Sequence, residues 1–245
     1  MARQPRYRLP GQPQHITQRG TNRSPIFGAR RDYEFYGECL EQACRRHGCV
    51  VHAYAMMTNH VHLLVTPTNA TGISKVMHSV GTRYAQYFNW KHDRTGAFWE
   101  SRYRSVVIDS ERYLLNCYRY IELNPVRAGI TSHPAEYQWS SYHANALGWR
   151  DRIVTPHRLY LSLDDDDATR MLAYRALCQT PLDDSILSEI RTATCTGWAL
   201  GQVPIRSDVL QRPARRAAPL PKGRRARIHS RSTEALTALP RVLTT

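Results

Sequence analysis

The chain has 245 residues, which is enough for one domain with an appendage or for two small domains. Lys and Arg number 34 against 20 Asp and Glu, so the formal net charge is +14, and a chain this basic is expected to meet a polyanion, nucleic acid first of all. No stretch approaches the roughly 18 apolar residues of a membrane span, and the N-terminal stretch lacks the apolar core of a signal peptide. These observations exclude a membrane protein and predict a soluble, cytoplasmic, nucleoid-associated one.

The positive charge is concentrated near the C-terminal end. From Arg206 to Arg241 there are ten basic and two acidic residues, a difference of +8 within the total of +14. The Pro- and Arg-rich composition after residue 205 predicts little fixed structure without a partner. We interpret residues 205–245 as a basic tail that binds DNA, or else as a solvated tail without a specific target. The candidate DNA contacts in it are Arg215, Arg216, Arg224 and Arg225.

Two patterns that could suggest metal or disulfide chemistry have simpler explanations. The six cysteines show no Cys-x-x-Cys spacing, which favours reduced structural thiols over zinc ligands or disulfides. The acidic run Asp164 to Asp167 favours a solvated loop that leads into a helix N-terminus over a metal site.

The first half of the chain alternates between strand and helix patterns. Expected strands cover residues 14–20, 49–57, the stretch after the turn at Thr58-Asn59, and 101–109; expected helices cover residues 30–48 and 72–94. The order strand, helix, strand, strand, helix, strand is that of the ferredoxin-like split βαβ fold, an α+β class. It predicts one antiparallel sheet with helices on one face and the other face left available.

The second half is predicted to be mostly helical. One helix runs from about Ser110, a candidate N-cap, to Pro125, and shorter helices are expected at 155–160, 166–178 and 182–197. We therefore divide the chain into a domain over residues 1–150, a helical extension over 151–204 and the basic tail over 205–245.

The stretch "NHVHLLVTP" places two histidines on one strand with a single residue between them. Because successive strand side chains point to opposite faces, His60 and His62 share one face, and Val61, Leu63 and Val65 share the other. The apolar set suits a core, and the two imidazoles suit a metal ion. The alternative is that both histidines are half-exposed polar residues.

The stretch "YIELNPVRAG" offers a phenol and an amide. Tyr120 and Asn124 are four residues apart and so lie on one helix face, and Pro125 predicts that Asn124 sits at the last turn. The alternative is a core tyrosine followed by a helix-end asparagine. Together with the two histidines, Asn124 would make an open site of two nitrogens and one oxygen, which suits Mg²⁺ or Mn²⁺ better than Zn²⁺.

Several arginines near these motifs are candidate DNA contacts. Cations and aromatic rings are mixed around residues 98–104, as on many nucleic-acid surfaces, although Phe98, Trp99 and Tyr103 are as compatible with a core. The candidates are Arg19, Arg23, Arg102, Arg104 and Arg127.

Taken together, "NHVHLLVTP", "RYRS", "RYIELNPVRAG", "WSSYHANALG" and "TPHRLYLSL" resemble the REP-associated tyrosine transposases, over about residues 7–200. These are HUH-type single-tyrosine transposases, relatives of the small insertion-sequence transposases of bacteria. The resemblance implies that His60 and His62 bind the divalent ion, that Asn124 completes its site, and that Tyr120 is the nucleophile. The smaller relatives carry Gln where this chain has Asn124, and a proline is expected where it has Thr58.

The resemblance implies an enzyme that cuts single-stranded DNA at short palindromic repeats folded as hairpins. Tyr120 would attack the scissile phosphate and release a 3′-hydroxyl, leaving a 5′-phosphotyrosine. Tyr118, with Glu122 four residues later, is the competing nucleophile, but it lies about 200° around the helix from Tyr120. The alternatives are a hairpin-binding regulator without catalysis and, from another class, a small-molecule metallohydrolase. A monomer and a homodimer are both compatible with the family.

Overall fold

The computed structural model describes residues 6–108 and 110–200. The predicted tail over 205–245 lies outside the described residues, together with its candidate contacts Arg215, Arg216, Arg224 and Arg225.

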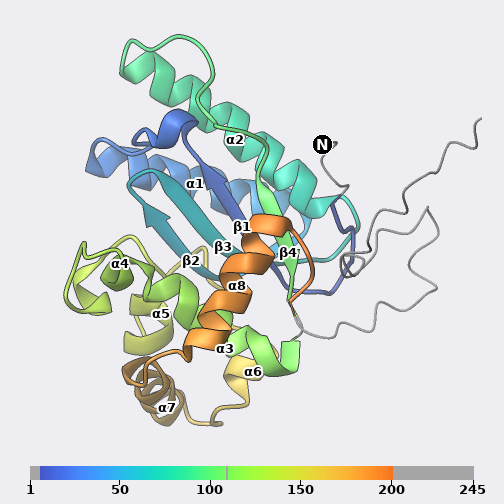
Figure 1. The fold of residues 1–245 in the computed structure, drawn as a ribbon, viewed down its shortest axis with the longest axis vertical. Helices are drawn as coiled ribbons and strands as arrows, with labels where there is room; N and C mark the ends of the chain where they lie inside the picture. Colours follow the sequence, from blue (N-terminus) through green and yellow to red (C-terminus); the bar gives the residue numbers. More distant parts are fainter. Residues whose placement is uncertain (1–5, 109, 201–245) are drawn as a thin grey trace, which may run out of the picture.

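A four-stranded antiparallel sheet forms the centre of the molecule (Figure 1). Its strands are β1 (Gln14–Arg19), β2 (Cys49–Met57), β3 (His60–Pro67) and β4 (Arg104–Val107), in the spatial order β2-β3-β1-β4. This order confirms the ferredoxin-like α+β fold. β4 is shorter than the predicted strand over 101–109.

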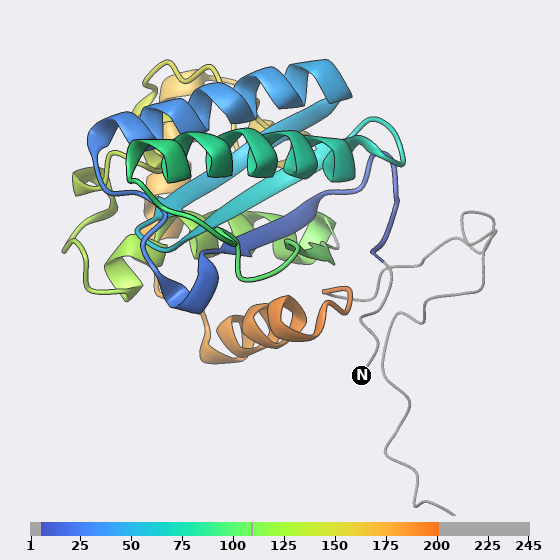
Figure 2. The ribbon, with the colours of Figure 1, turned by 90° about the horizontal axis from the view of Figure 1, so that it is seen from above.

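The first face of the sheet is covered by α1 (Arg30–His47) and α2 (Gly72–Lys91), as Figure 2 shows. Ile16, Val61 and Leu63 point from the strands into a core in which Tyr36 and Tyr84 are fully buried. Both helices match their predicted positions, and α1 ends at Gly48, whose φ of +66° is a left-handed helix cap. The prediction for Val61 and Leu63 is therefore confirmed.

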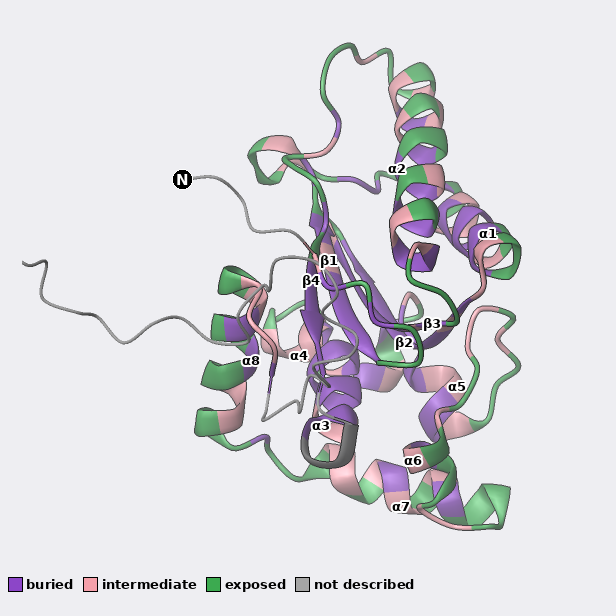
Figure 3. Cartoon of the chain, turned by 90° about the vertical axis from the view of Figure 1, so that its right-hand side faces the viewer, coloured by how far each residue is buried: buried purple, intermediate pink, exposed green. Residues whose placement is uncertain are grey.

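The second face of the sheet is covered as well, so the prediction that it is left available was wrong. Leu64 and Val106 point from the strands into a second core with Leu114 and Ile121 of α3 (Ser110–Glu122). In Figure 3 the strands are drawn mostly in the colour of buried residues. The strands carry apolar residues at both alternating positions along much of their length, as is typical of a sheet enclosed by helices on two sides.

The helix predicted to reach Pro125 is interrupted. α3 ends at Glu122, Leu123 has φ −86° and ψ 2°, and α4 (Asn124–Arg127) begins with Pro125 in its first turn. Proline lacks the N–H that would continue the helix, which explains why the break comes here. Asn124 thus begins a new helix instead of completing the last turn of α3.

The remaining elements build the layer around α3. They are the short helices η1 (Thr21–Arg23) and η2 (Pro134–Glu136), and the helices α5 (Tyr142–Leu147), α6 (Arg158–Leu161), α7 (Asp167–Gln179) and α8 (Asp184–Thr196). α8 lies beside β4 and α3 on the second face (Figures 1 and 2). Just beyond it, the Leu200 amide donates to the Val107 carbonyl oxygen, so the chain follows the free edge of β4.

The cysteines, the acidic run and the length of the helices bear on three further predictions from the sequence. All six cysteines are free thiols, as predicted. The Asp166 side chain accepts a hydrogen bond from the Thr169 amide and caps α7, so the acidic run does lead into a helix. Among the described helices, none is long and apolar enough to cross a membrane.

Candidate active site

A pocket of about 560 Å³ opens where β1, β3, α3 and α8 meet. His60, His62, Tyr120 and Asn124, which are predicted from two motifs 60 residues apart, all line it. The register of the sheet brings β1 alongside the histidines, with Thr17 opposite His62 and Arg19 opposite His60. The two histidine rings are 4.9 Å apart between centroids, so one ion could contact both.

A hydrogen bond fixes which nitrogen of His60 faces the pocket. Asn59 Nδ2 donates to the carbonyl oxygen of Arg23 (3.1 Å), which leaves Asn59 Oδ1 to accept from His60 Nδ1 (2.6 Å). An imidazole that donates from Nδ1 and is neutral carries its lone pair on Nε2. Burial and the charge of Arg19 lower the pKa of His60 to about 4, so the ring is neutral at physiological pH.

His62 is paired through the same nitrogen, but with another histidine. Its Nδ1 lies 2.8 Å from Nε2 of His15 on β1, and the two rings are stacked with centroids 5.1 Å apart. Burial lowers the pKa of His62 well below its ordinary value, and nearby positive charges act in the same direction. Since metals bind neutral imidazole, both histidines are in the form that a cation requires.

Tyr120 and Tyr118 have opposite surroundings. Tyr120 lines the pocket, with its ring 5.9 Å from that of His62 between centroids. Tyr118 is fully buried on the other side of α3, where its hydroxyl accepts from the His157 amide and its ring stacks on Tyr160. Of the two phenols, only Tyr120 is placed to reach a substrate in the pocket.

Glu122, the possible ligand paired with Tyr118, does not reach the pocket. It is fully buried and accepts hydrogen bonds from Ser141, Asn145 and Tyr174. Burial raises its pKa to about 7. Its contacts hold the end of α3 against α5 and α7, which is a structural task.

Arginines surround the opening of the pocket. Arg19, Arg23, Arg102 and Arg104 are exposed and line it, and their contact with DNA stays a prediction. Arg127 does not line it: its guanidinium lies over the Tyr120 ring at 4.5 Å and donates to the Tyr120 carbonyl oxygen. Phe98 and Tyr103 are buried in the core of the first face, so their rings are not available to stack on the bases of DNA.

Sequence reasoning missed residues that line the pocket and one, His15, that is hydrogen-bonded to His62 behind it. His15 shares the face of Thr17 in an alternating strand opposite the buried Ile16, a pattern that could have identified it. Glu100, an exposed carboxylate, lines the pocket from the segment before β4. Arg191 and Thr194 come from α8 and have no local sequence signal.

Residues 12–124 match the model of the family described as IS200-like transposases. Over these residues the chain is similar to an IS200-like transposase domain. The matched stretch contains the whole sheet, α1 to α3 and every motif residue of the pocket, from His60 to Asn124.

Two solved structures resemble the chain. One is described as a REP-associated tyrosine transposase bound to a REP hairpin; it is 16% identical, with a TM-score of 0.49 over 64% of this chain and 93% of that one. The other, from Deinococcus radiodurans, is described as a candidate transposase; it is 18% identical, with a TM-score of 0.34 over 48% of this chain and 93% of that one. A comparison with curated proteins gives no match.

The residues of the matched stretch that line the pocket fit a divalent cation. Across residues 6–108 and 110–200, no three His, Cys, Asp or Glu side chains converge as a metal site. A cation held by Nε2 of His60 and His62 would therefore take its oxygen ligands from the Asn124 amide and from water. Such a mixed nitrogen and oxygen set suits Mg²⁺ or Mn²⁺.

Proposed function

We propose that this protein is a metal-dependent single-strand DNA endonuclease and strand transferase, with Tyr120 as nucleophile. The observation that carries the proposal is the position of Tyr120: it lines the same pocket as the two neutral histidines, whereas Tyr118 is in the core. The exposed arginines at the opening would bind the DNA backbone on either side of the scissile phosphate.

The chain's own residues define the reaction. The Tyr120 oxygen attacks phosphorus, the bond from phosphorus to the 3′-oxygen breaks, and the 3′-oxygen leaves as a hydroxyl with the proton that the phenol gives up. The product is a 5′-phosphotyrosine, which keeps the bond energy for rejoining. A bound Mg²⁺ or Mn²⁺, held by His60, His62 and Asn124, would neutralise charge on the phosphate.

The surroundings of Tyr120 set the protonation state of its hydroxyl. Burial raises the pKa of Tyr120, and the positive charges of Arg127 and Arg191 oppose that effect. The phenol is therefore protonated in the resting protein, and its activation depends on positive charge close to its oxygen.

The substrate that we propose is DNA folded as a hairpin, in line with the motif resemblance to transposases that act on palindromic repeats. A pocket open to solvent and bordered by arginines can accept a single strand beside a duplex stem. Whether one chain or two form the functional unit is measured separately, from the native mass of the protein–hairpin complex, because a homodimer and a monomer differ in mass.

The experiment is a denaturing gel for a covalent protein–DNA adduct. Full-length protein is incubated with Mn²⁺ or Mg²⁺ and labelled single-stranded hairpins from its own genome, beside Tyr120→Phe and Tyr118→Phe. We expect an adduct with wild type and with Tyr118→Phe, and none with Tyr120→Phe or in excess EDTA.

Two results would contradict the proposal. An adduct that persists in Tyr120→Phe and disappears in Tyr118→Phe would move the nucleophile. Tight hairpin binding without any adduct, with both metals, would show a DNA-binding regulator in place of an enzyme.

A further inference from the structure

α8 borders the pocket although it lies 60 residues beyond the matched transposase domain. Its position is fixed by packing, because Ile190 and Ala193 are buried in the core of the second face. Arg104 of β4 also donates to the Cys195 carbonyl oxygen at its C-terminal end (3.3 Å). α8 is therefore a fixed wall of the pocket, and its side chains that line the pocket have defined positions.

Thr194 of α8 is hydrogen-bonded to the histidine pair. The Thr194 hydroxyl donates to the Ile190 carbonyl oxygen (2.7 Å). The hydroxyl oxygen of Thr194 also lies 3.4 Å from His15 Nδ1. Because its proton is already given to Ile190, Thr194 must accept from His15. His15 then carries its proton on Nδ1 and, as a neutral ring, accepts on Nε2.

This direction passes on to His62. His15 Nε2 accepts, so His62 Nδ1 must carry a proton, and the His62 lone pair is left on Nε2. A metal-binding histidine is commonly held in one tautomer by a hydrogen bond from its other nitrogen. Asn59 does this for His60, and the chain from Thr194 through His15 does it for His62.

Arg191 lies three residues before Thr194, on the same side of α8. It lines the pocket, and its side chain is within hydrogen-bonding reach of Tyr120, where its charge acts against the rise in the Tyr120 pKa caused by burial. Arg127 lies over the ring of Tyr120 and is bonded to its backbone, so Arg191 is the arginine directed at the phenol itself.

We propose that α8 completes the catalytic centre within the same chain. Arg191 is a catalytic residue that contacts the Tyr120 hydroxyl and the phosphate it attacks. Thr194 is a positioning residue that fixes, through His15, the tautomer in which His62 offers Nε2 to the cation. The proposal deepens the proposed function and rests on it.

The role of Thr194 is tested by titrating full-length protein with Mn²⁺ in a calorimeter. Thr194→Val removes the hydroxyl at almost constant volume, and we expect the affinity for Mn²⁺ to fall about tenfold. Thr194→Ser should restore it, and Thr192→Val, the same change at an exposed position of α8, should leave it unchanged. An unchanged affinity in Thr194→Val would overturn this role.

A double-mutant cycle separates the relay from simple packing. His15→Leu breaks the chain at its middle, so adding Thr194→Val to it should cost no further Mn²⁺ affinity. If the two losses add, Thr194 acts independently of His15 and the relay is wrong. Far-ultraviolet circular dichroism and thermal melts confirm that each variant is folded; should His15→Leu not fold, the pair Thr194→Val and Thr194→Ser decides.

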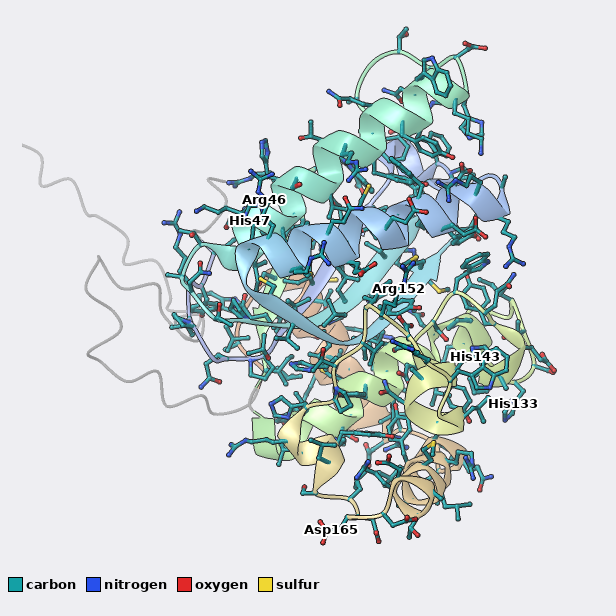
Figure 4. The ribbon with its side chains drawn as sticks, turned by 180° about the vertical axis from the view of Figure 1, so that it is seen from behind. Arg46, His47, His133, His143, Arg152 and Asp165 are labelled. Carbon is teal, nitrogen blue, oxygen red and sulfur yellow. The ribbon has the colours of Figure 1, made fainter. Side chains whose placement is uncertain are left out.

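The role of Arg191 is tested by the rate of adduct formation at saturating hairpin DNA. Arg191→Ala should lower this rate about a hundredfold, with hairpin affinity changed only a few-fold, and Arg191→Lys should keep part of it. Arg46→Ala, which removes the same charge at the distant C-terminal end of α1 (Figure 4), is the control. A loss confined to affinity, or equal in Arg46→Ala, would show that Arg191 is not catalytic.

The two proposals fail in different ways. If wild-type protein forms no adduct with any hairpin, the proposed function is wrong, and the Mn²⁺ titrations then decide on α8: an affinity that depends on Thr194 supports it, and one that does not overturns it. If wild type forms the adduct and Arg191→Ala and Thr194→Val behave as wild type, only the role of α8 is wrong.

Discussion

The two faces of the sheet are built from the same strands but do different work. On the first face, Ile16, Val61 and Leu63 meet α1 and α2 in an apolar core. On the second face, the neighbouring residues His15 and His62 form a hydrogen-bonded pair beside Tyr120. Because strand side chains alternate, one strand can anchor a domain with one set of residues and hold a cation with the other.

The buried carboxylates of the two layers show the same contrast. Asp32 in the first layer accepts from the Lys91 ammonium, the Tyr87 hydroxyl and two backbone amides. Glu122 in the second layer accepts from neutral groups alone. Burial acts to raise the pKa of both, but Lys91 and the other donors bring the Asp32 pKa down to about 2, whereas that of Glu122 rises to about 7.

The largest expected effect comes from removing a ligand on the second face. His60→Ala should lower adduct formation about a thousandfold or more and abolish Mn²⁺ binding, because a cation loses one of its two nitrogen ligands. Thermal stability should change little, since His60 is only partly buried. Adduct assays and calorimetry measure the first two quantities and a thermal melt the third. Full activity in His60→Ala would remove the metal site from the mechanism.

The next effect is its counterpart on the first face. Leu63 lies on β3, three residues after His60, and is fully buried. Leu63→Ala should lower the free energy of unfolding by about 2–5 kcal/mol, because it leaves a cavity in a closed core. Urea denaturation measures this loss. The protein that remains folded should bind Mn²⁺ with wild-type affinity. A Leu63→Ala variant of normal stability that fails to bind metal would mean that the two faces are not separable.

Much of this contrast was predictable from local patterns. The pairing of His60 with His62 and of Val61 with Leu63 depends only on the strand period, and the predicted hairpin places both sets correctly. Tyr120 was also separable from Tyr118 by the helical period, and the two do point to opposite sides of α3.

What was not predictable depends on contacts distant in sequence. His15 and His62 are 47 residues apart, and His15 and Thr194 are 179 residues apart, so no local pattern connects them. The cover over the second face was missed for the same reason, because it is contributed by helices after residue 110. The break at Leu123 was suggested by Pro125, but the new helix that begins at Asn124 was not.

Glu122→Gln should change how stability depends on pH. The pKa of Glu122 in the folded protein, about 7, lies above its ordinary value of 4.5. The contribution of Glu122 to the free energy of unfolding is therefore complete below about pH 4.5 and is lost as the pH rises towards 7. Gln stays neutral, so between pH 5 and 8 the free energy of unfolding of the variant should rise relative to that of wild type, by up to about 3 kcal/mol. Urea titrations at several pH values measure the difference. A difference that does not vary with pH would mean that Glu122 is ionised throughout.

The smallest expected effect has the opposite sign of pH dependence and comes from the first layer. The folded pKa of Asp32, about 2, lies below its ordinary value of 3.8, so its contribution is present above about pH 4 and is lost as the pH falls towards 2. Asp32→Asn should therefore destabilise the protein near neutral pH, on the order of 1–2 kcal/mol, a range reduced because Lys91 is partly open to water.

The same variant should approach wild type in stability as the pH falls from 4 to 2, because protonated Asp32 no longer attracts Lys91. Urea denaturation at pH 7, 4 and 3 gives the three differences, with Glu34→Gln, a partly exposed carboxylate of the same helix, as the control. If Asp32→Asn and Glu34→Gln lose equal stability at pH 7, the Asp32 network contributes no more than a surface ion pair. If the stability deficit of Asp32→Asn grows in acid, the pKa of Asp32 is not lowered. The charged donors around Asp32 and the neutral donors around Glu122 would then not shift the two pKa values in opposite directions.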